Sequence, residues 1–376
     1  MAIHPLTTEV HQALVNFIDE GRDCALIVVL HGSGSIPRQP GTKAIVDAEG
    51  SIWGTIGGGL LEAEARRLAV ESIRAKRPVL FDFRFTGAGV QSGDPICGGH
   101  LRVLVDPTVA DHRASYAQAA EALDQHRRGV LLTTVSGGEA PRVNVQWLPE
   151  SDFSERTESH FAEPIAQAIH STLDAEAPVF FADPQAATDG RTNLEGLAEL
   201  LCPTPLLLIA GAGHVGQALA RQAGLVGFRV VVHDDRPEFC EASLYPPDVI
   251  TRCGDVAALF EEFPLTEDTY VAIVGRGHLV DIRALALCIN KPVAYVGMMG
   301  SRRKVALVRR ELLESGVASE AQLNRLHAPI GLDIAAKTVP EIAASITAQL
   351  IAVRRAGRRA GKKHSTGRKS RRREAR

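Results

Sequence analysis

The sequence LLLIAGAGHVG, residues 206–216, is the clearest fold signal in this chain of 376 residues. Five apolar residues, typical of a buried parallel strand, run directly into a Gly-x-Gly-x-x-Gly turn and a helical segment that reaches about Gly224. A second apolar segment ends at Asp234, at the spacing where dinucleotide-binding folds carry an acidic residue. This order of strand, glycine turn, helix and acidic strand end predicts a Rossmann-like fold.

The glycines of this turn have distinct expected roles. Gly211 allows the tight turn, Gly213 lets a phosphate approach the backbone, and Gly216 lets the helix pack closely on the sheet. His214 lies inside the turn at the start of the helix, whose N-terminus attracts anions. The turn predicts a phosphate-bearing cofactor, with Asp234 or Asp235 as a candidate partner for a ribose hydroxyl. A Rossmann-like domain that has lost its ligand would carry the same pattern.

Strands and helices alternate through the second half of the chain. Strand-like segments at 228–233, 249–251, 270–274 and 293–296 are separated mostly by helical ones, and a further helix is expected at 340–354. This alternation predicts a doubly wound parallel sheet over residues 203–353. Such sheets bind ligands at the carboxyl ends of their strands. The polar candidates in those loops are Arg276, His278, Ser301 and Arg302.

The first 200 residues have a different pattern, which predicts a separate α+β domain. Short apolar strands and tight turns dominate, with helical spacing near 8–21, 60–76, 111–127 and 161–170. The expected strands are 24–30, 42–47, 51–56, 79–85, 101–105, 130–135, 142–148 and 178–181. The predicted fold class is therefore α/β, with a C-terminal Rossmann-like doubly wound parallel sheet and an N-terminal α+β domain.

Cys97 is the one cysteine set in a glycine-rich loop, within GDPICGGH at residues 93–100. Glycines let backbone N–H groups converge and let a ligand come close to the main chain. Cys97 is therefore a candidate nucleophile, metal ligand or sulfur carrier. The alternative is a small buried apolar residue, which is a common role for a free cysteine.

The composition is that of a soluble globular protein, with 45% hydrophobic and 23% charged residues. No apolar run approaches the ~20 residues of a membrane span, and the N-terminus has no signal-peptide pattern. Six scattered cysteines without a Cys-x-x-Cys pair favour free thiols in a reducing, cytoplasmic location.

The charge distribution is uneven along the chain. Residues 354–376 hold 12 Lys and Arg and one acid, so residues 1–353 carry a net charge of −13. An acidic body argues against a specific nucleic-acid-binding domain. The basic segment 354–376 is expected to be a disordered tail that is either dispensable or touches an acidic partner or, nonspecifically, RNA.

The first domain also contains glycine-rich motifs. They are GSGSIPRQPG at 32–41, GTIGGGLLEAE at 54–64 and the loop around Cys97. Together with GAGHVG at 211–216, DDRP at 234–237, GRGH at 275–278 and GMMGSRRK at 297–304, this ordered series resembles the XdhC/CoxI family over residues 10–353. The family comprises accessory proteins for the maturation of xanthine dehydrogenase and related molybdenum hydroxylases.

The resemblance implies a molybdenum cofactor, a phosphorylated molybdopterin, that the protein binds, protects during sulfuration and hands to a xanthine dehydrogenase-type apo-enzyme. It also implies a cysteine desulfurase as the sulfur source. By the same resemblance Cys97, Gly98 and Gly99 are expected at the molybdenum or sulfur. The expected phosphate or pterin contacts are Arg38, Gly57, Gly58 and Gly59. A homodimer is expected because homodimers are the commonest oligomers.

Two other functions stay open at this point. The Rossmann-like domain is compatible with an NAD(P)-dependent oxidoreductase, and Cys97 is compatible with a persulfide-carrying sulfurtransferase. The favoured role is a non-catalytic chaperone, because no Tyr–Lys pair or His–carboxylate pair stands out near the glycine turn. Leu60 occupies a position where many CoxI-like members carry a cysteine, so thiol chemistry would fall on Cys97 alone.

Overall fold

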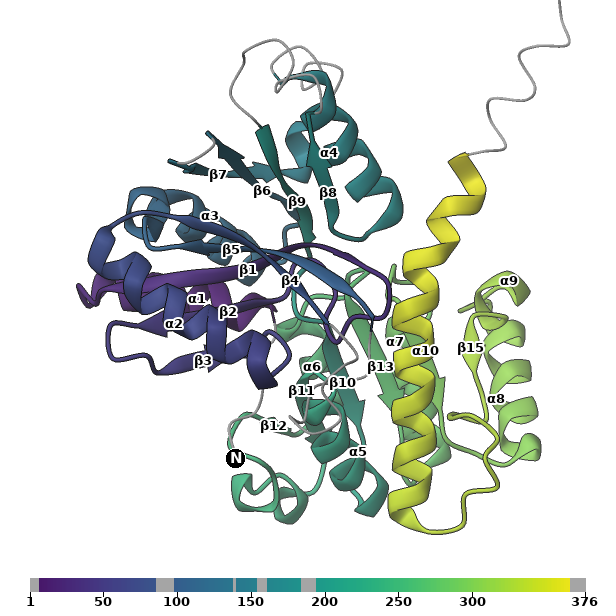
Figure 1. Cartoon of the computed structure of the whole chain (residues 1–376). Helices are drawn as coiled ribbons and strands as arrows, with labels where there is room; N and C mark the ends of the chain where they lie inside the picture. Colours follow the sequence, from purple (N-terminus) through teal and green to yellow (C-terminus); the bar gives the residue numbers. More distant parts are fainter. Residues whose placement is uncertain (1–6, 86–97, 138–139, 154–160, 184–193, 366–376) are drawn as a thin grey trace, which may run out of the picture. The chain divides into compact units, whose positions relative to one another are not determined.

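The computed structural model describes residues 7–85, 98–137, 140–153, 161–183 and 194–365, and side chains at 10–355 within those ranges. The chain divides into two compact units, unit 1 from Met1 to Pro203 and unit 2 from Thr204 to Arg376. Each unit has its own sheets and its own cores, so each is described by itself (Figure 1).

Unit 1 contains a five-stranded antiparallel sheet of order β3-β2-β1-β5-β4. Its strands are β1 (Cys24–Ser33), β2 (Lys43–Asp47), β3 (Ile52–Gly54), β4 (Val79–Arg84) and β5 (His100–Asp106). Alternate apolar residues of β1 face α2 (Gly59–Ala75) on one side of the sheet. The residues between them face α1 (Thr7–Asp19) and α3 (Arg113–Asp124) on the other side (Figure 1).

A second antiparallel sheet completes unit 1, with strand order β7-β6-β9-β8. Its strands are β6 (Gly129–Ser136), β7 (Arg142–Pro149), β8 (Val179–Ala182) and β9 (Leu194–Leu201). One face shares the core of the first sheet, where Leu131 and Leu197 are buried. The other face packs on α4 (Glu163–Ala175) through Ile165 and Ile169.

Strand β9 was not expected from the sequence. Its residues, LEGLAELL, include strong helix formers, and all are buried or half-buried, so no alternation marks a strand. In the structure β9 pairs along its whole length with β6 and over Glu195–Ala198 with β8. Tertiary pairing therefore overrides local propensity at this central position.

Unit 2 is a six-stranded parallel sheet of order β12-β11-β10-β13-β14-β15. Its strands are β10 (Leu206–Ala210), β11 (Arg229–Asp234), β12 (Ile250–Cys253), β13 (Thr269–Ile273), β14 (Tyr295–Met298) and β15 (Leu326–His327). The order reverses between β10 and β13, as in dinucleotide-binding folds. Together with the antiparallel sheets of unit 1, this confirms the predicted fold class.

Helices cover both faces of the parallel sheet. Helices α5 (His214–Leu225) and α10 (Val339–Ser365) pack on one face, and α6 (Val256–Glu262), α7 (His278–Cys288) and α8 (Arg302–Glu314) pack on the other. The short α9 (Glu320–Leu323) follows α8. Helix α10 extends to Ser365, past its expected end near 354, so the start of the basic segment is helical and not disordered. Arg, Lys and Ala are good helix formers, and cations suit a helix C-terminus.

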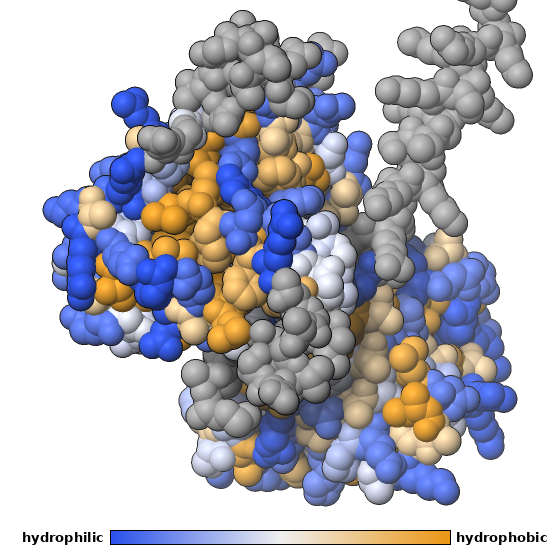
Figure 2. All heavy atoms as spheres, viewed as in Figure 1, coloured by the Kyte–Doolittle hydropathy of each residue, from blue (hydrophilic) through white to orange (hydrophobic). Residues whose placement is uncertain are grey.

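Hydrophilic and apolar side chains are interspersed on the face seen in Figure 2. Among the described side chains the most exposed large apolar ones are Leu279 (75%) and Leu225 (73%), which lie on different helices. Within the described ranges, none of the helices has the length and apolar character that crossing a membrane requires.

Candidate functional site

Glycine loops far apart in the sequence of unit 1 meet at the end of β1. A Cβ at Gly34 would lie 2.9 Å from the carbonyl oxygen of Gly98 and 3.2 Å from Cα of Gly99. A Cβ at Gly99 would overlap the carbonyl oxygen of Ser35. The segment after β1 therefore packs backbone to backbone against the residues that precede β5, and glycine is what permits this approach.

The same segment reaches the glycine triplet that precedes α2. A Cβ at Gly57 would lie 3.2 Å from Cγ of Pro37 and 3.4 Å from Cγ of Arg38, so these residues are neighbours. Nε of Arg38 is buried and has no hydrogen-bond acceptor among the described residues. A buried guanidinium N–H without an acceptor suits an anionic ligand. The structure thus brings Arg38, Gly57 and Gly99 to one loop cluster.

Two of the three backbone N–H groups at the triplet, however, already have acceptors. The N–H of Gly57 donates to Oγ1 of Thr55 (3.1 Å), and the N–H of Gly58 donates to Oε2 of Glu62 (3.2 Å). The same carboxylate oxygen accepts from the hydroxyl of Thr55 (2.6 Å) and the N–H of Ile56 (3.3 Å). Gly58 and Gly59 have positive φ of 75° and 60°, with open space at their Cβ positions, so backbone conformation alone explains these glycines.

Cys97 lies outside the described residues, and so does the loop 86–97. The residues that flank this loop, Phe85 and Gly98, are described, and the N–H of Phe85 donates to the carbonyl oxygen of Gly99 (2.9 Å). Leu60, the residue directly after the glycine triplet, is 51% exposed. Within the described residues no group of three or more His, Cys, Asp and Glu side chains forms a metal site.

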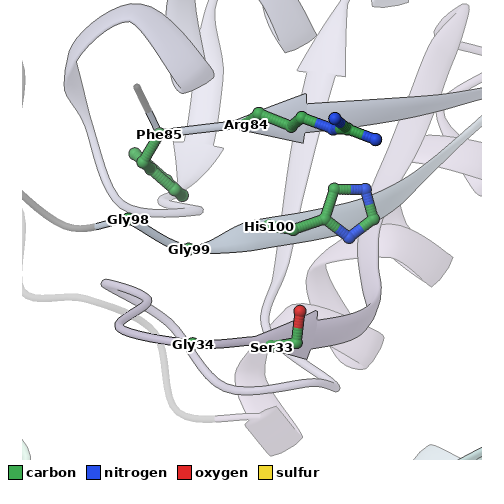
Figure 3. Close-up of a pocket in the computed structure, with 7 residues that line it drawn as sticks. All are labelled: Ser33, Gly34, Arg84, Phe85, Gly98, Gly99 and His100. Atoms are coloured by element: carbon green, nitrogen blue, oxygen red, sulfur yellow. The ribbon is translucent and has the colours of Figure 1, made fainter. Parts of the chain in front are cut away.

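A pocket of about 410 Å³ opens next to this loop (Figure 3). It is lined by Ser33, Gly34, Arg84, Phe85, Gly98, Gly99 and His100. Sequence reasoning found Gly98 and Gly99 but missed Ser33, Arg84 and His100. The one available signal was that His100 directly follows the glycine pair, and only strand pairing brings the other two beside it.

In unit 2 the first glycine loop lies at the carboxyl end of β10, next to the loop that follows β13. A Cβ at Gly211 would lie 2.6 Å from the backbone nitrogen of Gly275, and φ of Gly211 is 118°. A Cβ at Gly216 would overlap the carbonyl oxygen of Gly211, so helix α5 touches the turn. Gly213 has open space at its Cβ position and caps α5 without a side-chain hydrogen bond. The first N–H groups of a helix have no intrahelical acceptor, so this N-terminus suits an anion.

Asp234, at the end of β11, is buried and fully engaged by protein donors. Its Oδ2 accepts from the N–H of Ala212 (2.8 Å) and from Nη2 of Arg236 (3.1 Å). Its Oδ1 accepts from Nε (2.8 Å) and the backbone N–H (3.2 Å) of Arg236. Burial alone would raise the pKa of Asp234, but these donors outweigh burial and lower it. A ribose hydroxyl would have to displace one of them.

The remaining candidates of unit 2 lie at the same carboxyl edge, and all are exposed. His214 and His278 are the first residues of α5 and α7, and Ser301 caps α8 by accepting from the N–H of Lys304 (3.3 Å). Arg276 lies in the loop before α7, and Arg302 begins α8. The parallel topology gathers these residues, but Ser301 is already engaged as a helix cap.

One buried ion pair at this edge was missed by sequence reasoning. Asp281 of α7 is 1% exposed and bonds Nζ of Lys304, which also reaches the carbonyl oxygen of Met299 (3.4 Å). Burial raises the pKa of Asp281 despite the ammonium beside it. Its Oδ1 has no hydrogen-bond partner among the described residues and faces Gly275, whose Cβ would lie 2.7 Å away.

These features define a class of protein: an α/β chain that joins a glycine-looped antiparallel unit to a Rossmann-type unit. The chain belongs to the XdhC and CoxI family. The family model described as XdhC Rossmann domain matches residues 207–350, and the model described as XdhC and CoxI family matches residues 17–84. The predicted family is thereby confirmed.

Individual relatives are distant in sequence. The chain is 26% identical over 338 residues to the uncharacterized protein YqeB of Escherichia coli, covering 89% of this chain but only 44% of YqeB. It is 24% identical over 359 residues to a probable xanthine dehydrogenase subunit of Bacillus subtilis, covering 92% of this chain and 97% of that protein. A solved structure named as a xanthine dehydrogenase from Bacillus halodurans has the same fold, with a TM-score of 0.70, 22% identity, and coverage of 94% and 96%.

Proposed function

We propose that this protein binds the molybdenum cofactor, shields it while a terminal sulfur ligand is installed, and delivers it to a xanthine dehydrogenase-type hydroxylase. Membership of the XdhC and CoxI family supports this role. So does the similarity to a probable xanthine dehydrogenase subunit over nearly the whole of both chains. A cysteine desulfurase as sulfur donor, a homodimer and a cytoplasmic location belong to the same proposal.

The pocket beside the Cys97 loop is the observation that carries the proposal. Its lining includes three glycines, which let a flat heterocycle approach the main chain, and it also includes Arg84 and His100, which suit an anionic group. Cys97 immediately precedes Gly98, one of the lining residues. When bound, the cofactor would supply the molybdenum centre and the protein would supply a thiol, anion contacts and cover from water.

The engagement of Asp234 favours a chaperone over an NAD(P)-dependent oxidoreductase. Dinucleotide-binding folds use the acid at this position to accept hydrogen bonds from ribose. Here four donors from Ala212 and Arg236 occupy both carboxylate oxygens. The tyrosines of the parallel sheet, Tyr270 and Tyr295, are also buried in its core and not placed for proton transfer to a ligand.

The test is cofactor retention by the full-length protein. Purified protein is incubated with molybdenum cofactor and passed over a desalting column, and molybdenum and pterin are measured per chain. We expect about one of each for the wild type, and at least a tenfold loss for Cys97→Ser, because a thiolate ligand is removed. Cys253→Ser removes an exposed thiol of unit 2 and is the matched control.

Three results would contradict the proposal or part of it. A wild type that retains no cofactor but binds NAD(H) would support the oxidoreductase. An insoluble Cys97→Ser variant would make Cys97 structural. Equal retention by both cysteine variants would remove Cys97 from the site.

A further inference from the structure

The phosphate end of the cofactor needs hydrogen-bond donors, and two of the three backbone N–H groups of the glycine triplet are already engaged. At Gly57 and Gly58 these groups donate to Thr55 and to the Glu62 carboxylate. A phosphate at the start of α2 would also meet the like charge of Glu62. The pocket beside Gly98 holds further polar side chains.

Three polar side chains form a row across three neighbouring strands at this pocket. Arg84 of β4 is directly opposite His100 of β5, and His100 is directly opposite Ser33 of β1. Directly opposed residues of antiparallel strands project from the same face of the sheet. Figure 3 shows the side chains of Arg84 and His100 next to one another, with Ser33 on the third strand beside them.

The ion pairs around this row include His100 but not Arg84. Asp82 and Glu195 both pair with the neighbouring Arg102, with N–O distances of 2.7 Å to each. Asp82 also holds Nε2 of His100 at 3.0 Å. Arg84 has no acidic partner among the described residues, so no described carboxylate holds its N–H donors. An oxyanion is the ligand that such a fork of N–H donors binds best.

Gly98 differs from the other glycines of the pocket. Gly34 and Gly99 are explained by packing, because a Cβ at either would meet backbone atoms. Gly98 is exposed, and a Cβ there would have nothing within 4 Å among the described residues. Packing against the described residues therefore does not account for this glycine, which lines the pocket.

We propose that Arg84, His100 and Ser33 bind a tetrahedral oxyanion. In the loaded protein this oxyanion is the phosphomonoester of the cofactor's pterin, an assignment that rests on the proposed function. A free molybdate ion has the same shape and charge, and it is the other source that a test must separate.

The experiment titrates inorganic phosphate, and separately molybdate, into the cofactor-free full-length protein by calorimetry. Arg84→Gln removes the guanidinium of the row, and Arg74→Gln, at an exposed position in the last turn of α2, is the matched control. We expect phosphate to bind the wild type and Arg74→Gln equally, about tenfold weaker to Arg84→Gln, and to compete with cofactor loading. Circular dichroism checks that each variant is folded.

Other outcomes of these titrations would overturn the phosphomonoester, the anion site or the proposed function. Binding of molybdate without phosphate would assign the row to the metal oxyanion and overturn the phosphomonoester. No binding of either anion, or equal binding by the two arginine variants, would overturn the site itself. Arg84-dependent phosphate binding in a wild type that retains no molybdenum or pterin would keep the anion site and overturn the proposed function.

Discussion

Lys304 and Asp281 show how single residues shape the ligand-binding edge of unit 2. Asp281 is buried beneath the loop that follows β13, and Lys304 reaches it from the start of α8. A buried charge is tolerated when a partner compensates it, and it is costly when that partner is removed. The pair therefore ties α7 to α8 at the edge where three helices begin.

Lys304→Met should lower the free energy of unfolding of unit 2 by about 3–5 kcal/mol at pH 7, because Asp281 is left buried and charged. Burial raises the pKa of Asp281 above its ordinary value of 3.8. The folded state therefore binds a proton on Asp281 more tightly than the unfolded state does. Protonation removes the buried charge, so the loss of unfolding free energy in the variant should shrink as pH falls from 7 to 5. Urea unfolding at both pH values measures this. Arg303→Met changes an exposed neighbour, and its free energy of unfolding should stay within about 0.5 kcal/mol of the wild type. Equal destabilisation by Lys304→Met and Arg303→Met would contradict the role of the Lys304–Asp281 pair.

In the glycine turn after β10, one glycine is needed for packing and another lies where a ligand could bind. Gly216→Ala would press a methyl group against the carbonyl oxygen of Gly211, which belongs to the backbone and has little room to move. We expect a loss of about 1–3 kcal/mol in the free energy of unfolding. Gly213→Ala meets nothing within 4 Å and has an ordinary φ of −65°, so it should be as stable as the wild type within about 1 kcal/mol.

Chemical denaturation of the two variants tests this contrast. Equal stability of Gly216→Ala and wild type would mean that α5 can move away from the turn at no cost. A destabilised Gly213→Ala would mean that the open space at this residue is filled. A bulkier residue at 213 extends the test to whatever ligand the turn binds.

Elements with a clear local sequence pattern could be predicted. Elements that depend on pairing with distant strands could not. The strand, glycine turn and helix at 206–225 follow from composition and spacing, and the structure has them there. Strand β9 reads locally as a helix and becomes a strand only because β6 and β8 lie on its two sides.

The candidate site also has residues that the sequence predicts and residues that only the structure brings together. Several of its glycines could be predicted from the sequence, because positive φ or close backbone approach requires glycine at those positions. Arg84 and Ser33 are far from His100 along the chain, and strand register alone brings them together. The sequence also gives no sign that Glu62 and Arg236 already occupy groups that a ligand was expected to use.

At the scale of the whole molecule, the chain has two compact units with different ligand-binding equipment. Unit 1 offers a glycine-lined pocket with cationic side chains, and unit 2 offers helix N-termini at the carboxyl edge of a parallel sheet. The residues predicted for cofactor binding are divided between the two units, and Cys97 lies outside the described residues. Residues 1–353 are acidic and the C-terminal segment is basic, so charge alone favours different partners for the two.

Transfer of the cofactor tests the central claim most directly. The protein is loaded with molybdenum cofactor, freed of excess, and mixed with a cofactor-free xanthine dehydrogenase-type hydroxylase, and molybdenum is measured in each protein over time. A chaperone should lose molybdenum as the hydroxylase gains it in about equal amount and becomes active, with none passing through the bulk solution. Molybdenum that stays on this protein, or a protein that never takes it up and binds NAD(H) instead, would contradict the account.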